Sequence, residues 1–222
     1  MSTHISGVAA PLAIDNLDTD QIMPKQFLRG IDKAGLAQGV LYDLRIDGDG
    51  RPRGDFVLNR PGFEETAILV SGPNFGCGSS REHAVWGLQQ FGIRAVIAAG
   101  YGEIFYGNAL NNRLLPVVVA PDAAQALLDH LVADPQPQRL AIDVAAKVVH
   151  APTGNLPFDL PGRYHRMFLD GLDVIGATLQ HRSAIEEFAT RHWATRPWMR
   201  DVAAKTRSRL DRAASGAGGP VS

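Results

Sequence analysis

Short apolar runs alternate with amphipathic stretches through the middle of the chain. Runs typical of buried strands span residues 66–71, 94–99 and 114–120. An apolar stripe that Gly92 closes predicts a helix between the first two strands, and residues 102–112 predict a second helix. This alternation of strand and helix predicts an α/β fold with parallel strand pairing.

The flanking segments complete one domain. Residues 7–14 predict an N-terminal strand, and Pro121 begins a further helix with leucines on one face. After that helix we expect short antiparallel strands and then helices, at residues 140–144, 147–150 and 157–160 and at residues 162–171 and 183–194. We expect a single domain over residues 1–200. Because its end is rich in Gly, Ser and Pro, residues 201–222 predict a flexible C-terminal tail.

Composition narrows the function classes. The net charge of −1 argues against a nucleic-acid binder, and no apolar run approaches the roughly 20 residues of a membrane span. With no targeting segment either, we expect a cytoplasmic protein. The single cysteine, Cys77, excludes an internal disulfide and an iron–sulfur cluster held by this chain alone. Residues 191–212 hold seven basic and two acidic residues, which indicates a solvated tail or a contact with an acidic partner.

The Gly-rich loop after the first of these strands carries the candidate chemistry. Gly76 and Gly78 allow positive φ and close approach to a ligand. Ser79 and Glu82 match the Ser-x-x-Glu capping box, so the loop is expected to lead into a helix N-terminus that attracts anions. Arg81 adds a guanidinium suited to a carboxylate. The pattern predicts a carboxylate pocket lined by hydroxyl groups.

Other named motifs do not fit this loop. It lacks the glycine spacing of a dinucleotide site, the lysine of a P-loop and the Gly-x-Ser-x-Gly of a nucleophile elbow. Cys77 beside His83 could form a thiolate nucleophile and base. The alternative interpretation makes Cys77 a small buried residue and His83 a helix-packing residue.

Five motifs in one order give the chain a family resemblance. They read Asp-Asn-Leu-Asp-Thr-Asp-Gln-Ile-Met-Pro at 15–24, Phe-Val-Leu-Asn at 56–59, Gly-Cys-Gly-Ser-Ser-Arg-Glu-His-Ala at 76–84, Ile-Phe-Tyr-Gly-Asn at 104–108 and Gly-Leu-Asp-Val-Ile-Gly-Ala-Thr-Leu at 171–179. Over residues 5–190 the chain resembles the aconitase-type swivel domains, and among them the separate small subunits of 3-isopropylmalate dehydratase. The resemblance implies a three-layer β/β/α swivel fold, with parallel strands, short antiparallel strands and C-terminal helices.

The resemblance also implies an activity. Such a small subunit belongs to a hydro-lyase of leucine biosynthesis that isomerises 2-isopropylmalate and 3-isopropylmalate by dehydration and rehydration. It is active only with a large subunit, which carries a [4Fe–4S] cluster acting as a Lewis acid on the substrate hydroxyl. This chain would then bind no metal, and its partners would be the large subunit and a small dicarboxylate.

Site residues are carried over from the matching motifs. Ser79 would be the base that removes the proton α to a carboxylate, an unusual task for a serine, which needs its alkoxide stabilised. Ser80, Arg81 and Arg29 would bind substrate carboxylates. The supporting residues would be Asp18, Asp20, Gly76, Gly78, Glu82 and His83, where the two aspartates also fit an Asx turn.

One loop departs from the family pattern and leaves alternatives open. Residues 27–35 read Phe-Leu-Arg-Gly-Ile-Asp-Lys-Ala-Gly, whereas the dehydratase small subunits often read Phe-Leu-Lys-Arg-Val-Thr-Arg-Thr-Gly there. The resemblance implies that this loop sets substrate choice, so methylmalate, dimethylmalate or citramalate-type acids are alternative substrates. A stand-alone enzyme that uses Cys77 and a non-catalytic anion-binding module are the alternatives from other classes.

Overall fold

The computed structural model describes residues 3–28 and 34–216 of the 222-residue chain. The chain divides into two units, residues 1–174 and residues 175–222. Among the residues described, every helix is too short or too polar to cross a membrane.

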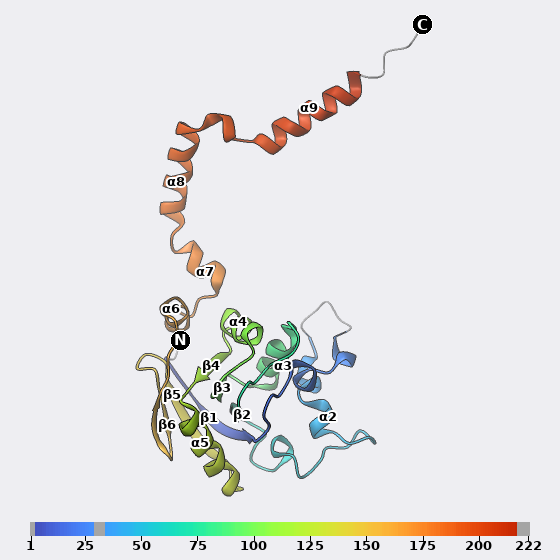
Figure 1. Ribbon diagram of the computed structural model, residues 1–222, viewed down its shortest axis with the longest axis vertical. Coiled ribbons are helices and arrows are strands. Elements are labelled where there is room, and N and C mark those ends of the chain that lie inside the picture. The colour runs from blue at the N-terminus through green and yellow to red at the C-terminus, as the bar shows by residue number, and fades with distance from the viewer. Residues whose placement is uncertain (1–2, 29–33, 217–222) are drawn as a thin grey trace. The chain divides into compact units, whose positions relative to one another are not determined.

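One mixed sheet forms the framework of the larger unit (Figure 1). Its strand order is β4-β3-β2-β1-β5-β6-β7. The strands are β1 (His4–Leu12), β2 (Thr66–Ser71), β3 (Ala95–Ala98), β4 (Leu115–Val118), β5 (Gln138–Asp143), β6 (Val148–Ala151) and β7 (Gly154–Pro157). Strands β1 to β4 pair in parallel, whereas β5, β6 and β7 pair antiparallel. The expected α/β fold with parallel and short antiparallel strands is confirmed, and all seven strands belong to one hydrogen-bonded sheet.

Two strand predictions need correction. The first strand spans His4–Leu12 rather than residues 7–14, because its N-terminal half pairs with β5. The last strand is Gly154–Pro157, whereas residues 157–160 were expected. Gly154 has a φ of 121°, which allows the tight turn from β6 into β7 three residues earlier than the apolar pattern indicated.

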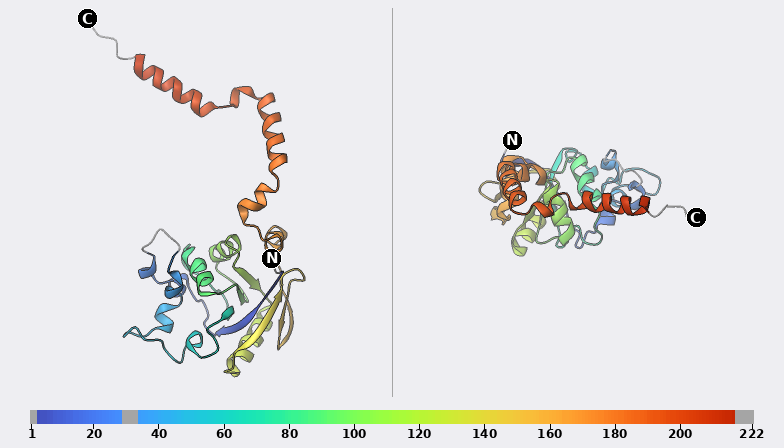
Figure 2. Two further views of the ribbon diagram at one scale, coloured as in Figure 1. Left: turned by 180° about the vertical axis from the view of Figure 1, so that it is seen from behind. Right: turned by 90° about the horizontal axis from the view of Figure 1, so that it is seen from above.

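Helices cover both faces of the sheet. The longer ones are α3 (His83–Phe91), α4 (Glu103–Asn111), α5 (Pro121–Ala133) and α6 (Gly162–Asp170), and the short ones are α1 (Thr19–Ile22) and α2 (Tyr42–Arg45). Helix α5 packs against β1, β2 and β3 (Figures 1 and 2). Neighbouring residues of β2 point to opposite faces, so that Leu69 joins the apolar cluster with α3, while Ile68 joins the cluster with α5. The sheet is therefore packed from both sides.

The C-terminal unit is helical. It contains α7, which begins at the boundary (Val174–Leu179), α8 (Arg182–Thr195) and α9 (Val202–Gly216). The helix expected at 183–194 is confirmed as α8. Helix α9 lies inside the segment expected to be a flexible tail. The domain limits of 1–200 and 201–222 themselves stay a prediction.

Candidate active site

Two loops meet at one edge of the sheet. One loop follows β1 and leads into α1, and the other follows β2 and leads into α3. Because β1 and β2 are adjacent and parallel, their carboxyl ends lie at the same edge. Backbone hydrogen bonds join the two loops: Gly76 N–H donates to the Leu17 carbonyl (2.7 Å), and Thr19 N–H donates to the Cys77 carbonyl (2.9 Å). Two of the five motifs that carry the resemblance, at residues 15–24 and 76–84, are therefore joined at one candidate site.

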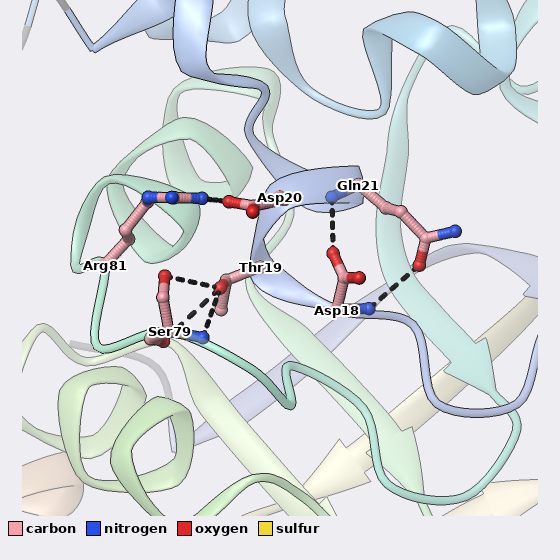
Figure 3. Close-up of polar contacts among 6 residues, drawn as sticks. All are labelled: Asp18, Thr19, Asp20, Gln21, Ser79 and Arg81. Carbon is pink, nitrogen blue, oxygen red and sulfur yellow. Dashed lines mark hydrogen bonds and ion pairs between the residues drawn. The ribbon is translucent and has the colours of Figure 1, made fainter.

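A capping box is present, but in the first loop rather than the second. The Asp18 carboxylate accepts the Gln21 backbone N–H (2.7 Å), and the Asp18 N–H donates to Gln21 Oε1 (3.0 Å). Both bonds are drawn in Figure 3. Asp18 therefore begins helix α1.

The capping box expected at Ser79 and Glu82 is wrong. Helix α3 begins at His83, and Glu82 stands in its N-cap position without a side-chain capping bond. Ser79 lies four residues before the first residue of this helix, and its N–H and its hydroxyl hydrogen-bond to Thr19. The loop therefore continues to Glu82, and the expected anion site of a helix beginning at Ser79 is not formed.

Ser79 is held by Thr19, a residue that the motif pattern did not single out. The Ser79 N–H donates to Thr19 Oγ1 (3.1 Å), and the two hydroxyl oxygens lie 2.9 Å apart (Figure 3). Thr19 is only 1% exposed, while Ser79 is half-buried. The sequence signal for this contact was a hydroxyl-bearing residue between the two aspartates of the Asp-Thr-Asp motif.

Arg81 forms an ion pair with Asp20. Its Nη1 meets Asp20 Oδ1, and the Arg81 side chain is 22% exposed against 47% for that of Asp20. In Figure 3 this pair is drawn above Ser79 and Thr19, to the left of the Asp18–Gln21 capping box. A guanidinium carries five N–H donors, so pairing with one carboxylate leaves donors for a second. The arrangement suits the binding of an anionic ligand close to the Ser79 hydroxyl.

The neighbours of this pair anchor the loop to helix α4. The Ser80 carbonyl accepts from Asn108 Nδ2 (3.4 Å), and the residue is exposed. The Glu82 carboxylate accepts from Asn112 Nδ2 (2.5 Å). The His83 ring packs against Trp86, with centroids 4.8 Å apart, which agrees with a packing role.

Glycine and aromatic rings shape the floor of the loop. Gly76 has a φ of 72°, and a Cβ there would come within 2.3 Å of the Phe105 ring. Gly78 has a φ of 91°. Beneath them, the Tyr101 hydroxyl donates to the Val96 carbonyl (2.6 Å), and burial raises the pKa of this phenol well above its usual value. Tyr101 therefore stays neutral and supports the loop structurally.

Cys77 and Arg29 complete the predicted residues. The half-buried Cys77 thiol donates to the Asn16 carbonyl (3.2 Å). Across residues 3–28 and 34–216, no three His, Cys, Asp or Glu side chains are grouped so as to hold a metal ion. Arg29 lies outside the described residues.

Comparisons with known proteins agree with the motifs. The family model for the aconitase C-terminal domain matches residues 1–122, and the model for the C-terminal domain of the 3-isopropylmalate dehydratase small subunit matches residues 175–202. The "3-isopropylmalate dehydratase small subunit 1" of Chromobacterium violaceum is 58% identical over 94% of this chain and 98% of its own. The 3-isopropylmalate dehydratase small subunit of Caulobacter vibrioides is 45% identical over 89% of this chain and 97% of its own.

A solved structure shares the fold. The crystal structure of 3-isopropylmalate dehydratase from Methanocaldococcus jannaschii superposes with a TM-score of 0.61 at 28% identity. The match covers 83% of this chain and 98% of that chain. The swivel-type fold that the motifs implied is thereby confirmed.

Proposed function

Because the chain belongs to the family of 3-isopropylmalate dehydratase small subunits, we propose that it works as the small subunit of that hydro-lyase. With a large subunit it would interconvert 2-isopropylmalate and 3-isopropylmalate in leucine biosynthesis. The observation that carries this proposal is the joining of the two motif loops, which brings Ser79 beside the Asp20–Arg81 pair. The relatives carry the name of isopropylmalate, which favours it over methylmalate, dimethylmalate and citramalate-type acids.

Ser79 takes the role of the base. Its Oγ, as an alkoxide, removes the proton on the carbon next to a substrate carboxylate, and the O–H bond forms as the C–H bond breaks. The released electron pair forms the C=C bond, and the hydroxyl of the neighbouring carbon leaves with its own bonding pair. Rehydration in the reverse sense, with the hydroxyl on the other carbon, completes the isomerisation.

Charged and polar neighbours orient the substrate. Arg81 binds a substrate carboxylate through N–H donors that Asp20 does not use, and Asp20 positions the guanidinium. The exposed Ser80 supplies a further hydroxyl. Arg29 is proposed as a second carboxylate ligand. These contacts would place the acidic C–H near Ser79 Oγ.

An iron–sulfur cluster does not fit the residues of this chain. A cubane cluster is held by cysteine thiolates, and Cys77 is the single cysteine, with its thiol donating to a backbone carbonyl. We place the cluster on the large subunit, where it would supply a Lewis acid for the leaving hydroxyl. The cytoplasmic location and the lack of nucleic-acid binding stay predictions.

Reconstitution with a matching large subunit tests the proposal. We expect the purified chain to show no isomerase activity alone and to gain it when the cluster-bearing large subunit is added. Ser79→Ala should lower kcat by at least about 10³-fold without preventing assembly, because the base is lost. Ser6→Ala, at an exposed serine of β1, is the matched control and should keep full activity.

Two outcomes would contradict the proposal. Full turnover by Ser79→Ala in the complex would favour a non-catalytic anion-binding module. Turnover by the chain alone that is lost in Cys77→Ala would favour the stand-alone cysteine enzyme.

A further inference from the structure

A buried hydroxyl faces the proposed base. Thr19 Oγ1 lies 2.9 Å from Ser79 Oγ, 3.1 Å from the Ser79 nitrogen and 3.3 Å from the Ser79 carbonyl oxygen. We propose that Thr19 is a positioning residue, whose hydroxyl fixes Ser79 Oγ and donates a hydrogen bond to it when the serine is deprotonated. This inference rests on the proposed role of Ser79.

In the hydrogen bond between the two hydroxyls, Thr19 is the donor once Ser79 is deprotonated. A hydroxyl has one proton to donate, and Thr19 Oγ1 already accepts the Ser79 N–H. While Ser79 is neutral, its own hydroxyl can donate to Thr19, whose proton then points to the Ser79 carbonyl. Once Ser79 is an alkoxide it can only accept, so the Thr19 proton turns to Ser79 Oγ. A hydrogen bond made to the charged form lowers the pKa of the group that carries the charge.

Other sources of stabilisation near Ser79 are weaker than the sequence indicated. Helix α3 begins four residues later, so its N-terminal N–H groups belong to the residues after Glu82. Arg81 is paired with the Asp20 carboxylate, which offsets its charge. Within the described part of the chain, Thr19 is the one hydrogen-bond partner of Ser79 Oγ.

Backbone hydrogen bonds and burial hold Thr19 in place. Its N–H donates to the Cys77 carbonyl (2.9 Å), and its carbonyl accepts the Met23 N–H (3.0 Å). Asp18 caps the helix turn that Thr19 begins. A β-branched side chain that is 1% exposed has little rotamer freedom. The hydroxyl is therefore preorganised toward the position of developing charge.

Three variants of the reconstituted enzyme test this role. Thr19→Val keeps the shape and removes the hydroxyl, whereas Thr19→Ser keeps the hydroxyl. Thr66→Val is the matched control, because Thr66, the first residue of β2, is 2% exposed and its hydroxyl donates to the Phe63 carbonyl (2.7 Å). Thr19→Val should lower kcat at neutral pH by about tenfold or more, with KM changed little, and should move the rising limb of the kcat–pH profile up by about one pH unit.

The controls separate positioning from stability. Thr66→Val should lower the unfolding temperature without moving the pH profile, and Thr19→Ser should restore most of kcat. The inference would be overturned if Thr19→Val kept the wild-type pH profile, or lowered kcat no more than Thr66→Val does.

A thiol probe tests the same hydroxyl in the chain without a large subunit. Cys77→Ala with Ser79→Cys leaves a single thiol at position 79, whose pKa follows from the pH dependence of its alkylation by iodoacetamide. Adding Thr19→Val should raise that pKa by about one unit, and adding Thr66→Val should not change it. An unchanged thiol pKa would overturn the inference. It would leave the proposed function standing if Ser79→Ala still abolished turnover, so the two failures are distinguishable.

Discussion

The two units of the chain use apolar residues in opposite ways. All buried residues among the described side chains lie in the unit of residues 1–174, where most of the apolar ones form two clusters on the two faces of the sheet. The unit of residues 175–222 buries none of its described side chains and exposes Phe188 (57%), Trp198 (68%) and Leu210 (64%). Hydrophobic content by itself therefore does not show where a core forms.

Charge separates the units as well. The C-terminal unit has eight basic and four acidic residues, for a net charge of +4, whereas the larger unit has 14 basic and 19 acidic residues, for a net charge of −5.

The two long helices of the C-terminal unit, α8 and α9, have 14 and 15 residues, and isolated helices of this length are only marginally stable in water without tertiary packing. We conclude that the larger unit supplies the folding stability as well as the site.

The largest expected difference comes from truncating one phenylalanine in each unit. Phe105→Ala should lower the free energy of unfolding by about 3–5 kcal/mol, because Phe105 is 1% exposed and packs beneath Gly76. Phe188→Ala should change it by less than about 0.5 kcal/mol. Urea denaturation measures both free energies of unfolding. Equal losses in the two variants would contradict the difference in burial between the two units.

A smaller effect is expected from adding a methyl group to the site loop. Gly76→Ala should destabilise the chain by about 1–3 kcal/mol, because the residue has positive φ and its Cβ would clash with Phe105. Gly107→Ala is the control within helix α4, where a Cβ meets no atom within 4 Å, and it should stabilise by about 0.5–1 kcal/mol. The unfolding temperatures of the two variants test this prediction. A higher unfolding temperature in Gly76→Ala than in the wild type would contradict the loop geometry.

A pH effect is expected at the edge of the larger unit. The hydrogen bond from Lys147 Nζ to Asp159 Oδ1 (3.2 Å) lowers the pKa of this carboxyl below its usual value, with help from the Leu160 N–H. Because the folded-state pKa is the lower one, the stabilisation is present above the unfolded-state pKa and disappears as pH falls through the folded-state value. Urea denaturation at pH values from 6 down to 3 should show that the free energy of unfolding falls less in Asp159→Asn than in the wild type. An equal fall of the free energy of unfolding in both proteins would contradict a stabilising Lys147–Asp159 ion pair between the ends of the β6–β7 hairpin.

The smallest effect is expected from removing the C-terminal unit. A chain that ends at residue 174 should unfold within about 1 kcal/mol of the full chain, because both apolar clusters lie before that residue. Calorimetry of the two chains measures this directly. A drop of several kcal/mol would show that the second unit contributes to folding stability.

Much of the fold was predictable because its signals are local. The strand at 66–71, the helix at 162–171 and the glycine that ends α3 depend on the periodicity and backbone freedom of neighbouring residues. The β6–β7 turn was misplaced because a glycine at positive φ decided it, rather than the apolar pattern.

The sequence by itself determined the strand and helix alternation, the family and the residue types of the loop, since these follow from local pattern and motif order. Only the tertiary structure decided what Ser79 does in that loop. A Ser-x-x-Glu pattern is a capping box only if a helix begins directly after the serine, and here helix α3 begins at His83. The Ser79 hydroxyl instead hydrogen-bonds to Thr19, sixty residues away in the chain, because parallel pairing of β1 and β2 brings the two loops together.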